Sequence, residues 1–458
     1  MPSVTGSRPL RRYLQGGCLV LVILIGMFLR FSTAAGTTVD RPIRNDAKDY
    51  VAYAWNLKYL GVYSLDFSAI LGTSTTPKPD AIRPPGYPLL IATILPKYID
   101  GLLSYRVAYV QAWIATLTLL FAAWLSMELL GAWCGLIVGL LFALSPHQSV
   151  YVAYLLTETL YGATLIAAVG SAVLALKAKQ PRWRYAFAVI AGLFFGLSCL
   201  VRPTLNQWVP VLVLLLLFPS VRRFRNEIIA LALGFVLIMS PWWLRNEITL
   251  HQLSDSTKML QTVQQGTYPD FMYENRPETF GNAYSYDPAL AKIGTSWTRL
   301  FADMREKFES RPLAMTKWYL FGKIGYFFSW SSAEGWADMY SYPVWTSPWI
   351  TDPVFIVVVS VMKGAYVPLI VCGLLGMLVA FLPSTMRFFG SYRTDAIRFI
   401  ALLHLFAIVV HVIGTPIGRY SVPFRPITFL LAIFFVLWLS RHYLEHKSRI
   451  SPVAIAHD

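Results

Sequence analysis

Long apolar stretches recur along this chain of 458 residues, and mostly short polar segments separate them. Most of the stretches approach the ~20 residues that a helix needs to cross a bilayer. The pattern therefore predicts an all-α integral membrane protein, a polytopic bundle of about ten transmembrane helices. The predicted spans are residues 14–31, 105–127, 131–146, 153–176, 185–201, 204–219, 227–244, 362–382, 397–415 and 424–440.

Two polar stretches, 35–104 and 245–352, are too long to be simple turns. The second is rich in Tyr, Trp, Asp and Gly, and we expect short amphipathic helices in it, such as one over 287–311. The chain then divides into an N-terminal membrane module (1–244, with the loop 35–104), a loop region (245–352), and C-terminal membrane helices with a tail (353–458). Lys363 interrupts the apolar run that starts at Val354, so the first part of that run is expected to lie along the membrane surface.

Charge supports the membrane assignment and orients the chain. Hydrophobic residues make up 56% of the chain and charged residues only 14%, which excludes an ordinary soluble domain. The net charge of +15 comes from basic residues in short loops, so nucleic acid is not an expected partner. Alternate connections hold Lys177, Lys179, Arg182 and Arg184; Arg222, Arg223 and Arg225; Arg387, Arg393 and Arg398; and, in the tail, Arg441, Lys447 and Arg449. The positive-inside rule places these loops and both termini in the cytoplasm, and 35–104 and 245–352 outside.

The loop 35–104 carries an unusual polar face. If its start is helical, Asp46, Asp49, Tyr50 and Tyr53 stand at i, i+3, i+4 and i+7 and share one face. Two carboxylates and two phenols make a poor core stripe and a plausible acid–base site. The alternative is that Asn45 or Asp46 only caps the helix, since both residue types are preferred caps.

The loop closes on a rigid cationic segment, Arg83-Pro84-Pro85, followed by Tyr87. The two prolines hold the backbone extended and point the guanidinium in a fixed direction. An acidic cluster and a fixed cation beside a membrane favour chemistry on an anionic, lipid-linked substrate. The alternative is an arginine that snorkels to lipid head groups.

These motifs, Asp-Ala-x-x-Tyr from Asp46 and Arg-Pro-Pro-x-Tyr-Pro from Arg83, resemble the first outer loop of GT-C polyprenyl-phosphate-sugar glycosyltransferases. That group includes the protein mannosyltransferases and the lipid A aminoarabinose transferase. Pro-Trp-x-x-Arg-Asn, which ends at Arg245-Asn246, is also similar to bacterial members. The resemblance implies that Asp46 is the base that activates the acceptor, with Asp49 a weaker candidate, and that Arg83 contacts the carrier phosphate.

Other candidates stand at the same membrane level. Glu158, at the outer start of the fourth span, looks like the acidic residue that follows the third span in the family, and intramembrane carboxylates are usually functional. Arg245, Arg202 and the pair Arg419-Tyr420 lie on the outer side as well. With Arg83 they make four outer arginines, more than anchoring needs, and an anionic ligand explains them. We expect Tyr50, Tyr53 and Tyr87 to line the acceptor or sugar site.

No cofactor is certain. The zinc site of the aminoarabinose branch needs a Glu just before its Lys-Pro-Pro, and Ile82 stands there in this chain. His404 and His411 are expected to pack in the core. We therefore predict no metal site; a divalent cation remains possible, but the sequence offers no clear ligand set for one.

Together these features predict an inverting glycosyltransferase of the plasma (inner) membrane. It would move a sugar from a polyprenyl-phosphate donor to a lipid, glycan or protein acceptor at the outer face. One alternative is a flippase or transporter of lipid-linked sugars, which should place its key charges near the bilayer midplane. Another is an O-antigen ligase or polymerase, which depends on a large arginine-rich outer loop. A non-enzymatic scaffold would not need the outer carboxylates and arginines.

Overall fold

The computed structural model describes residues 7–73, 76–255, 257–294, 296–331 and 338–450, and almost all of its regular structure is helical. Within these residues, eight helices are long and apolar enough to cross a membrane, which makes this a multi-pass membrane protein. They are α1 (Ser7–Gly36), α4 (Leu103–Leu130), α7 (Glu158–Lys177), α8 (Pro181–Val201), α11 (Arg225–Leu250), α18 (Pro353–Val379), α20 (Ser391–Ile413) and α21 (Arg425–Ile450), the last led in by η9 (Gly418–Phe424).

Two predicted spans are shorter than expected. The prediction 131–146 corresponds to α5 (Ala132–Leu144), which bends by 55° into α6 (Pro146–Val150) and η2 (Tyr151–Ala153). The prediction 204–219 is an apolar helical stretch over Pro203–Leu217, made of η3 (Pro203–Leu205), α9 (Trp208–Leu214) and η4 (Leu215–Leu217). At ~1.5 Å per residue, neither matches the ~30 Å hydrocarbon core. The described residues thus contain eight full-length candidate spans, or nine with the bent pair, where the sequence predicted about ten.

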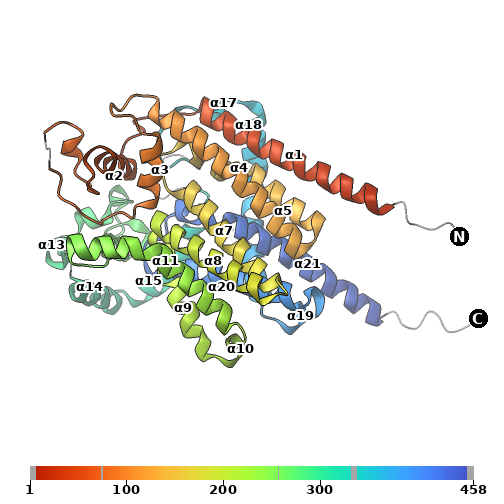
Figure 1. Cartoon of the computed structure of the whole chain (residues 1–458). Helices are drawn as coiled ribbons and strands as arrows, with labels where there is room; N and C mark the ends of the chain where they lie inside the picture. The colour runs from red at the N-terminus through yellow and green to blue at the C-terminus, as the bar shows by residue number, and fades with distance from the viewer. Residues whose placement is uncertain (1–6, 74–75, 256, 295, 332–337, 451–458) are drawn as a thin grey trace, which may run out of the picture.

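Each of these short segments still carries the chain from one end of the helix bundle to the other. The end of α4 meets the end of α7, since Lys177 bonds Glu128, so α5 must carry the chain back between them. The end of α8 lies beside the start of α7, since Arg202 bonds Glu158, whereas α11 starts at the opposite end beside Arg223. The segment Pro203–Leu217 makes that return. With these two short segments included, the described chain passes between the two ends ten times, so the start of α1 and the end of α21 lie at one end, as Figure 1 shows.

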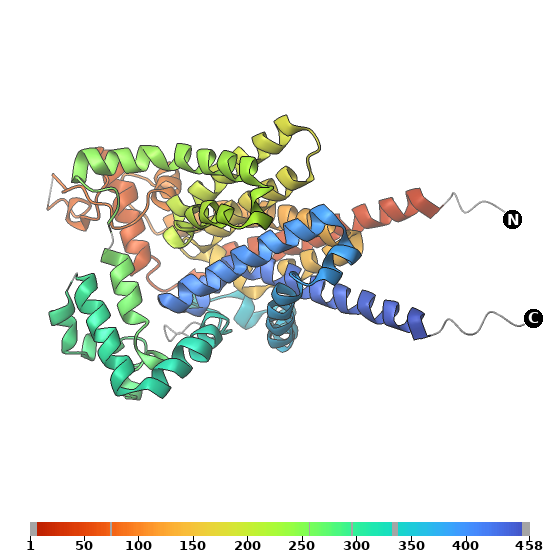
Figure 2. The same ribbon diagram turned by 90° about the horizontal axis from the view of Figure 1, so that it is seen from below.

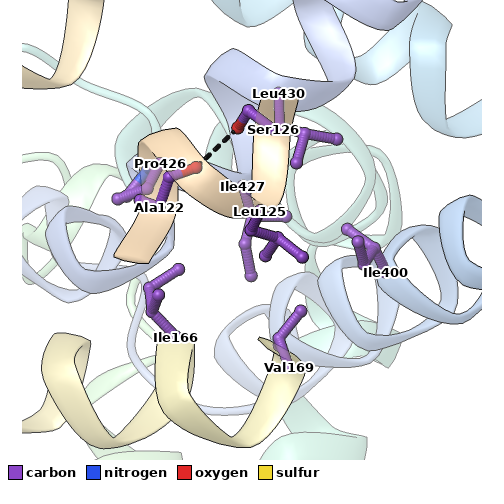
Figure 3. A pocket seen from close by; sticks show the side chains of 9 residues that line it. All are labelled: Ala122, Leu125, Ser126, Ile166, Val169, Ile400, Pro426, Ile427 and Leu430. Carbon is purple, nitrogen blue, oxygen red and sulfur yellow. Dashed lines mark hydrogen bonds between the residues drawn. The ribbon is translucent and has the colours of Figure 1, made fainter. Parts of the chain in front are cut away.

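Small residues let the helices pack closely. A Cβ on Gly192 of α8 would lie 1.9 Å from the Leu231 carbonyl oxygen of α11, and one on Gly234 would lie 2.1 Å from the Val189 oxygen. The α8–α11 crossing thus depends on glycine from both helices. The core among α4, α7, α20 and α21 is equally tight: the apolar gap beside Leu125 and Ile427 in Figure 3 holds only about 10 Å³. That is about the space of one water molecule.

The remaining elements gather mainly at the end opposite the termini, which we call the loop end; the other end is the basic end (Figures 1 and 2). The loop-end elements are α2 (Asp46–Leu60), η1 (Phe67–Ala69), α3 (Gly86–Ile94), α12 (Thr257–Gln265), η5 (Pro269–Phe271), η6 (Pro277–Thr279), η7 (Ala283–Tyr286), α13 (Ala289–Ile293), α14 (Trp297–Ser310), α15 (Pro312–Lys317), the π-helical turn η8 (Trp318–Gly322), α16 (Lys323–Phe327) and α17 (Pro348–Thr351). At the basic end are α10 (Pro219–Arg222) and α19 (Pro383–Phe389). The strands β1 (Thr38–Val39) and β2 (Val344–Thr346) pair antiparallel and join the two long loops.

Two local expectations are wrong. The helix predicted over 287–311 is broken into α13 and α14, because Gly294 takes a φ of 53° between them. The apolar run from Val354 belongs to one continuous helix, α18, so the expected interruption at Lys363 does not occur. Lys363 does not interrupt it, because its ammonium bonds Asp338 at 3.1 Å and stands over the Trp330 ring.

Candidate active site at the loop end

The first turn of α2 is not an ordinary helix cap. Asn45 precedes it with a φ of 46° and makes no capping hydrogen bond through its side chain. The Asp46 and Asp49 carboxylates follow in the first turn and accept hydrogen bonds from arginine side chains. The capping alternative therefore does not account for these acids.

Arg83 holds both carboxylates of this turn. Its Nη2 donates to Asp46 Oδ1 at 2.6 Å and to Asp49 Oδ2 at 2.7 Å, while its Nε donates to the same Asp49 oxygen at 3.0 Å. The Arg83 backbone is held in turn, because its carbonyl accepts a 2.9 Å hydrogen bond from the Tyr63 hydroxyl. The guanidinium lies 5.5 Å from the Tyr50 ring centre. The three charged side chains keep 19–23% of their surface exposed, so they remain reachable.

A second arginine arrives from the far end of the chain. Arg419, in η9, donates from Nη2 to the other Asp46 oxygen at 2.6 Å, although the two residues are 373 positions apart. Its Nε lies 4.0 Å from Glu158 Oε1, and the same Glu158 oxygen accepts a 3.0 Å hydrogen bond from Arg202. The Tyr420 ring lies 4.0 Å from the Arg202 guanidinium. Glu158 begins α7 and Arg202 follows the end of α8, so the backbones of two spanning helices fix this inner half of the site.

We call these six residues the arginine–carboxylate cluster: Asp46, Asp49, Glu158, Arg83, Arg202 and Arg419. Exposure falls from 23% at Asp46 to 7% at Arg419 and 2% at Glu158, so the cluster runs from a partly exposed rim to a buried floor. Its three cations and three anions balance. It joins residues from α2, the Arg83 segment, α7, the end of α8 and η9.

The paired charges shift the ionisation of the cluster. Burial would raise the pKa of Asp46, but the charges of Arg419 and Arg83 and their hydrogen bonds outweigh it and hold that pKa well below its usual range. Burial lowers the pKa of Arg83, yet Tyr50, Asp46 and Asp49 raise it above the usual value. Burial also lowers the pKa of Arg202, but the negative charge of Glu158 outweighs this effect and raises that pKa above its usual value. At neutral pH Asp46 is therefore an anion and Arg83 a cation.

The predicted tyrosines line this region unequally. Tyr50 packs edge-on against Tyr87 with ring centres 5.1 Å apart, and burial raises the pKa of Tyr50 to about 12. The Tyr87 hydroxyl is already committed to Gln111 at 3.1 Å, and the Tyr53 hydroxyl donates to Asp80. Tyr53 of α2 and Tyr87 of α3 are fully buried, so they pack these two helices into the core.

Arg245 has other partners. It donates to the backbone carbonyls of Asp80 at 2.8 Å and Tyr63 at 3.0 Å, and so ties the end of α11 to the loop that carries Arg83. Asp80, which the sequence analysis missed, organises the same loop. Besides Tyr53, its carboxylate accepts the backbone N–H groups of Leu65 at 2.7 Å and Ile82 at 3.2 Å. Its position three residues before Arg83 was the only sequence signal.

The described residues contain no group of three or more His, Cys, Asp or Glu side chains that could hold a metal ion. Each carboxylate of the arginine–carboxylate cluster faces a guanidinium, so the donors suit an anion better than a cation. His404 lies 3.2 Å from the Thr428 hydroxyl and His411 lies 2.7 Å from the Ala407 carbonyl oxygen, and both are buried.

Comparisons with known proteins give the fold. No protein-family model and no curated protein sequence matches this chain. Among solved structures it is similar to the Archaeoglobus fulgidus oligosaccharyltransferase tethered with an acceptor peptide, with a TM-score of 0.50 and 17% identity over 97% of this chain and 51% of that one. The chain thus spans about half the length of that enzyme. It is also similar to ArnT from Cupriavidus metallidurans bound to undecaprenyl phosphate, with a TM-score of 0.42 and 15% identity over 93% and 78% of the two chains. The GT-C-like fold predicted from the sequence is confirmed.

Proposed function

We propose that this protein is an inverting glycosyltransferase that moves a sugar from a polyprenyl-phosphate donor to an acceptor hydroxyl or amine. The observation that carries the proposal is the Asp46 carboxylate held between Arg83 and Arg419 at a membrane surface. The oligosaccharyltransferase and ArnT named above support the same kind of activity, since glycosyl transfer suits the fold they share with this chain.

The arginines provide a site for the carrier phosphate. A polyprenyl phosphosugar has one negative charge on its phosphate, and departure of the sugar leaves a second. Arg83, Arg419 and Arg202 therefore attract the leaving group more strongly as the bond breaks, which is the differential binding that lowers a barrier. Arg245 contributes indirectly, because it fastens the loop in which Arg83 stands.

Asp46 would act as the base once the donor is bound. Alone, it is a weak base, because the two arginines hold its pKa low. A bound phosphate competes for Arg83 and Arg419 and supplies negative charge beside Asp46, so the pKa of the carboxyl rises. The acceptor oxygen or nitrogen then attacks the anomeric carbon and its proton passes to Asp46. The carbon–oxygen bond to phosphate breaks with its electron pair on the phosphate, and one displacement inverts the anomeric centre.

Glu158 has a separate task in this scheme. One of its oxygens holds Arg202, while the other is buried and has no hydrogen-bond partner among the described residues. A buried carboxylate oxygen without a donor is costly. A hydroxyl of the sugar or the acceptor would satisfy it, and Asp49 would hold Arg83 in place beside Asp46.

The location of the cluster weighs against a flippase or transporter. Glu158 is the first residue of its spanning helix and Arg202 directly follows another, so these charges lie at helix ends, away from the midplane. The basic loops lie at the other end, which the positive-inside rule assigns to the cytoplasm. The site would then face the outside of the plasma (inner) membrane, where a lipid, glycan or protein acceptor is available.

The test compares lipid extracts and envelope glycans from a strain that lacks the gene with those from its parent. We expect polyprenyl monophosphosugar to accumulate and one acceptor to lack a single sugar. Wild-type protein should reverse both changes, and Asp46→Asn protein should reverse neither. An accumulated polyprenyl diphosphate glycan would instead indicate an O-antigen ligase or polymerase. Unchanged lipids and glycans would contradict the proposal.

A further inference from the structure

The basic end of the bundle contains a cavity that the proposed reaction does not use. It has a volume of about 520 Å³ and lies where α7 ends and where α8, α11 and α20 begin. This size is within the ~300–1,000 Å³ typical of ligand sites. Its charged lining consists of Lys177, Lys179, Arg184, Arg223 and Asp395. Four cations thus face the cavity with a single carboxylate.

Pairing with neighbours leaves this cavity positive. Lys177 bonds Glu128 at 2.9 Å, Arg184 bonds Glu227, and Arg223 bonds Asp395 at 2.6 Å. Lys179 makes no ion pair or hydrogen bond with the described part of the chain. Lys177, Arg184 and Arg223 keep 36–52% of their side-chain surface exposed, so an incoming anion can reach them.

Helix ends add to the positive potential. Arg184 lies in the first turn of α8, Phe224 immediately precedes α11, and Ser391 is the first residue of α20. These helices are 21, 26 and 23 residues long, and each directs the positive end of its dipole and its free backbone N–H groups toward the cavity region. The C-terminal end of α7 opposes them, but Lys177 in its last turn offsets that end.

The cavity is on the opposite membrane surface from the arginine–carboxylate cluster. Glu158 and Lys177 are the first and last residues of α7, whose 20 residues span ~30 Å, the thickness of the hydrocarbon core. A donor bound at Asp46 cannot also reach this cavity with its phosphate. A ligand here must come from the leaflet or the solution at the basic end.

We propose that this cavity binds the phosphate head group of an anionic phospholipid from the leaflet at the basic end. Basic pockets between spanning helices on the cytoplasmic side suit such head groups. The ligand is a phosphodiester lipid, because the cavity lies at the ends of lipid-embedded helices, where acyl chains can extend along the bundle. The proposal does not depend on the glycosyltransferase activity.

The test uses purified full-length protein in phosphatidylcholine nanodiscs, with and without phosphatidylglycerol. Native mass spectrometry counts the retained phosphatidylglycerol, and thermal unfolding reports the gain in stability. The probing variant is Lys179→Gln/Arg223→Gln. The matched control is Arg387→Gln/Lys447→Gln at the same end but outside the cavity. Each pair removes one lysine and one bridged arginine, and both arginines are 52% exposed.

We expect phosphatidylglycerol to stay bound to the wild type and the control and to raise their melting temperatures. Each lost cation should weaken binding about fivefold, so the cavity variant should bind about 25-fold more weakly. Asp395→Asn removes the carboxylate that lines the cavity and should strengthen binding. Equal losses in the two double variants would mean that general surface charge attracts the lipid, and would overturn the proposal. The lipid source would be wrong if inorganic phosphate alone raised the melting temperature as much as phosphatidylglycerol.

Discussion

The two ends of α7 and α8 carry cations in opposite arrangements. At the loop end, three arginines meet three carboxylates at short distances, and the floor of the cluster is 2–7% exposed. At the basic end, the cations outnumber the carboxylates around a cavity and keep a third to a half of their surface in the open. Charged side chains of the same kinds thus form a fixed, neutral site at one surface and a positive site that attracts anions at the other.

The difference suits the loop end to catalysis and the basic end to the attraction of anions. Exposed ion pairs contribute little to stability, and buried ones often cost as much desolvation free energy as they return. Stability alone therefore does not explain why six charged residues are gathered in this cluster, whereas the proposed binding of a substrate phosphate does. The open cations at the basic end need no such precision, because they act through the summed field at the membrane surface.

The largest expected effect concerns sidedness. In a chain whose four cysteines are replaced by serine, Thr76→Cys at the loop end should react with an impermeant maleimide in intact cells. Ser220→Cys in α10, at the basic end, should react only after the membrane is opened. Both positions are exposed, so accessibility is matched. The reverse pattern would place the arginine–carboxylate cluster on the cytoplasmic side and would contradict the proposed transfer at the outer face.

The next effect is on turnover. Asp46→Asn keeps the size of the side chain and an oxygen that accepts from one arginine, but the amide cannot take a proton. Sugar transfer should fall by roughly 10²- to 10⁴-fold. Asp40→Asn is the control, because Asp40 is another loop-end carboxylate, lies outside the arginine–carboxylate cluster, and pairs with Arg44 at 3.9 Å. Near-normal transfer by the Asp46 variant would show that Asp46 is not the base, and Glu158 would then be the candidate.

The sequence predicted the parts of the site whose signals are local. The i, i+3 spacing placed Asp46 and Asp49 on one helical face, and Arg83-Pro84-Pro85 marked a rigid cation; the structure joins them within 3.0 Å. The membrane level of Glu158, Arg202 and Arg419 followed from counting spans. Their pairing could not be predicted, because nothing local connects Arg419 to a carboxylate 373 residues away.

The errors in the fold have a common cause. Lys363 and the polar residues of 287–311 were judged from their own segments, whereas distant partners and one backbone angle decide their structure. Asp338 satisfies Lys363 so that α18 continues, and Gly294 ends α13. The basic cavity escaped notice for the same reason. Each of its loops fits the positive-inside rule alone, and only the packing of α8, α11 and α20 brings their first turns together.

A smaller loss of turnover is expected at Arg83. Arg83→Ala removes an aimed donor and should lower the rate roughly 10²-fold. Arg83→Lys should recover part of it, because a lysine keeps the charge but not the two-nitrogen contact with Asp49. Arg106→Ala is the control, since Arg106 pairs with Asp100 at the same end at 42% exposure. If Arg83→Ala resembled that control, Arg83 would only anchor the loop.

The smallest effect is a pH-dependent change in stability. The folded pKa of Asp46 lies below its unfolded value of ~3.9, so the carboxylate stabilises the fold above pH ~4 and loses this contribution as the pH falls toward the folded pKa. Asp46→Asn should therefore cost on the order of 1–3 kcal/mol at pH 7, as expected for a charged hydrogen bond. The gap in melting temperature between variant and wild type should stay constant from pH 7 to pH 5 and shrink between pH 4 and pH 3. Thermal unfolding in phosphatidylcholine nanodiscs measures this gap. A gap that did not change at acid pH would assign the loss to packing around Asp46 rather than to its charge.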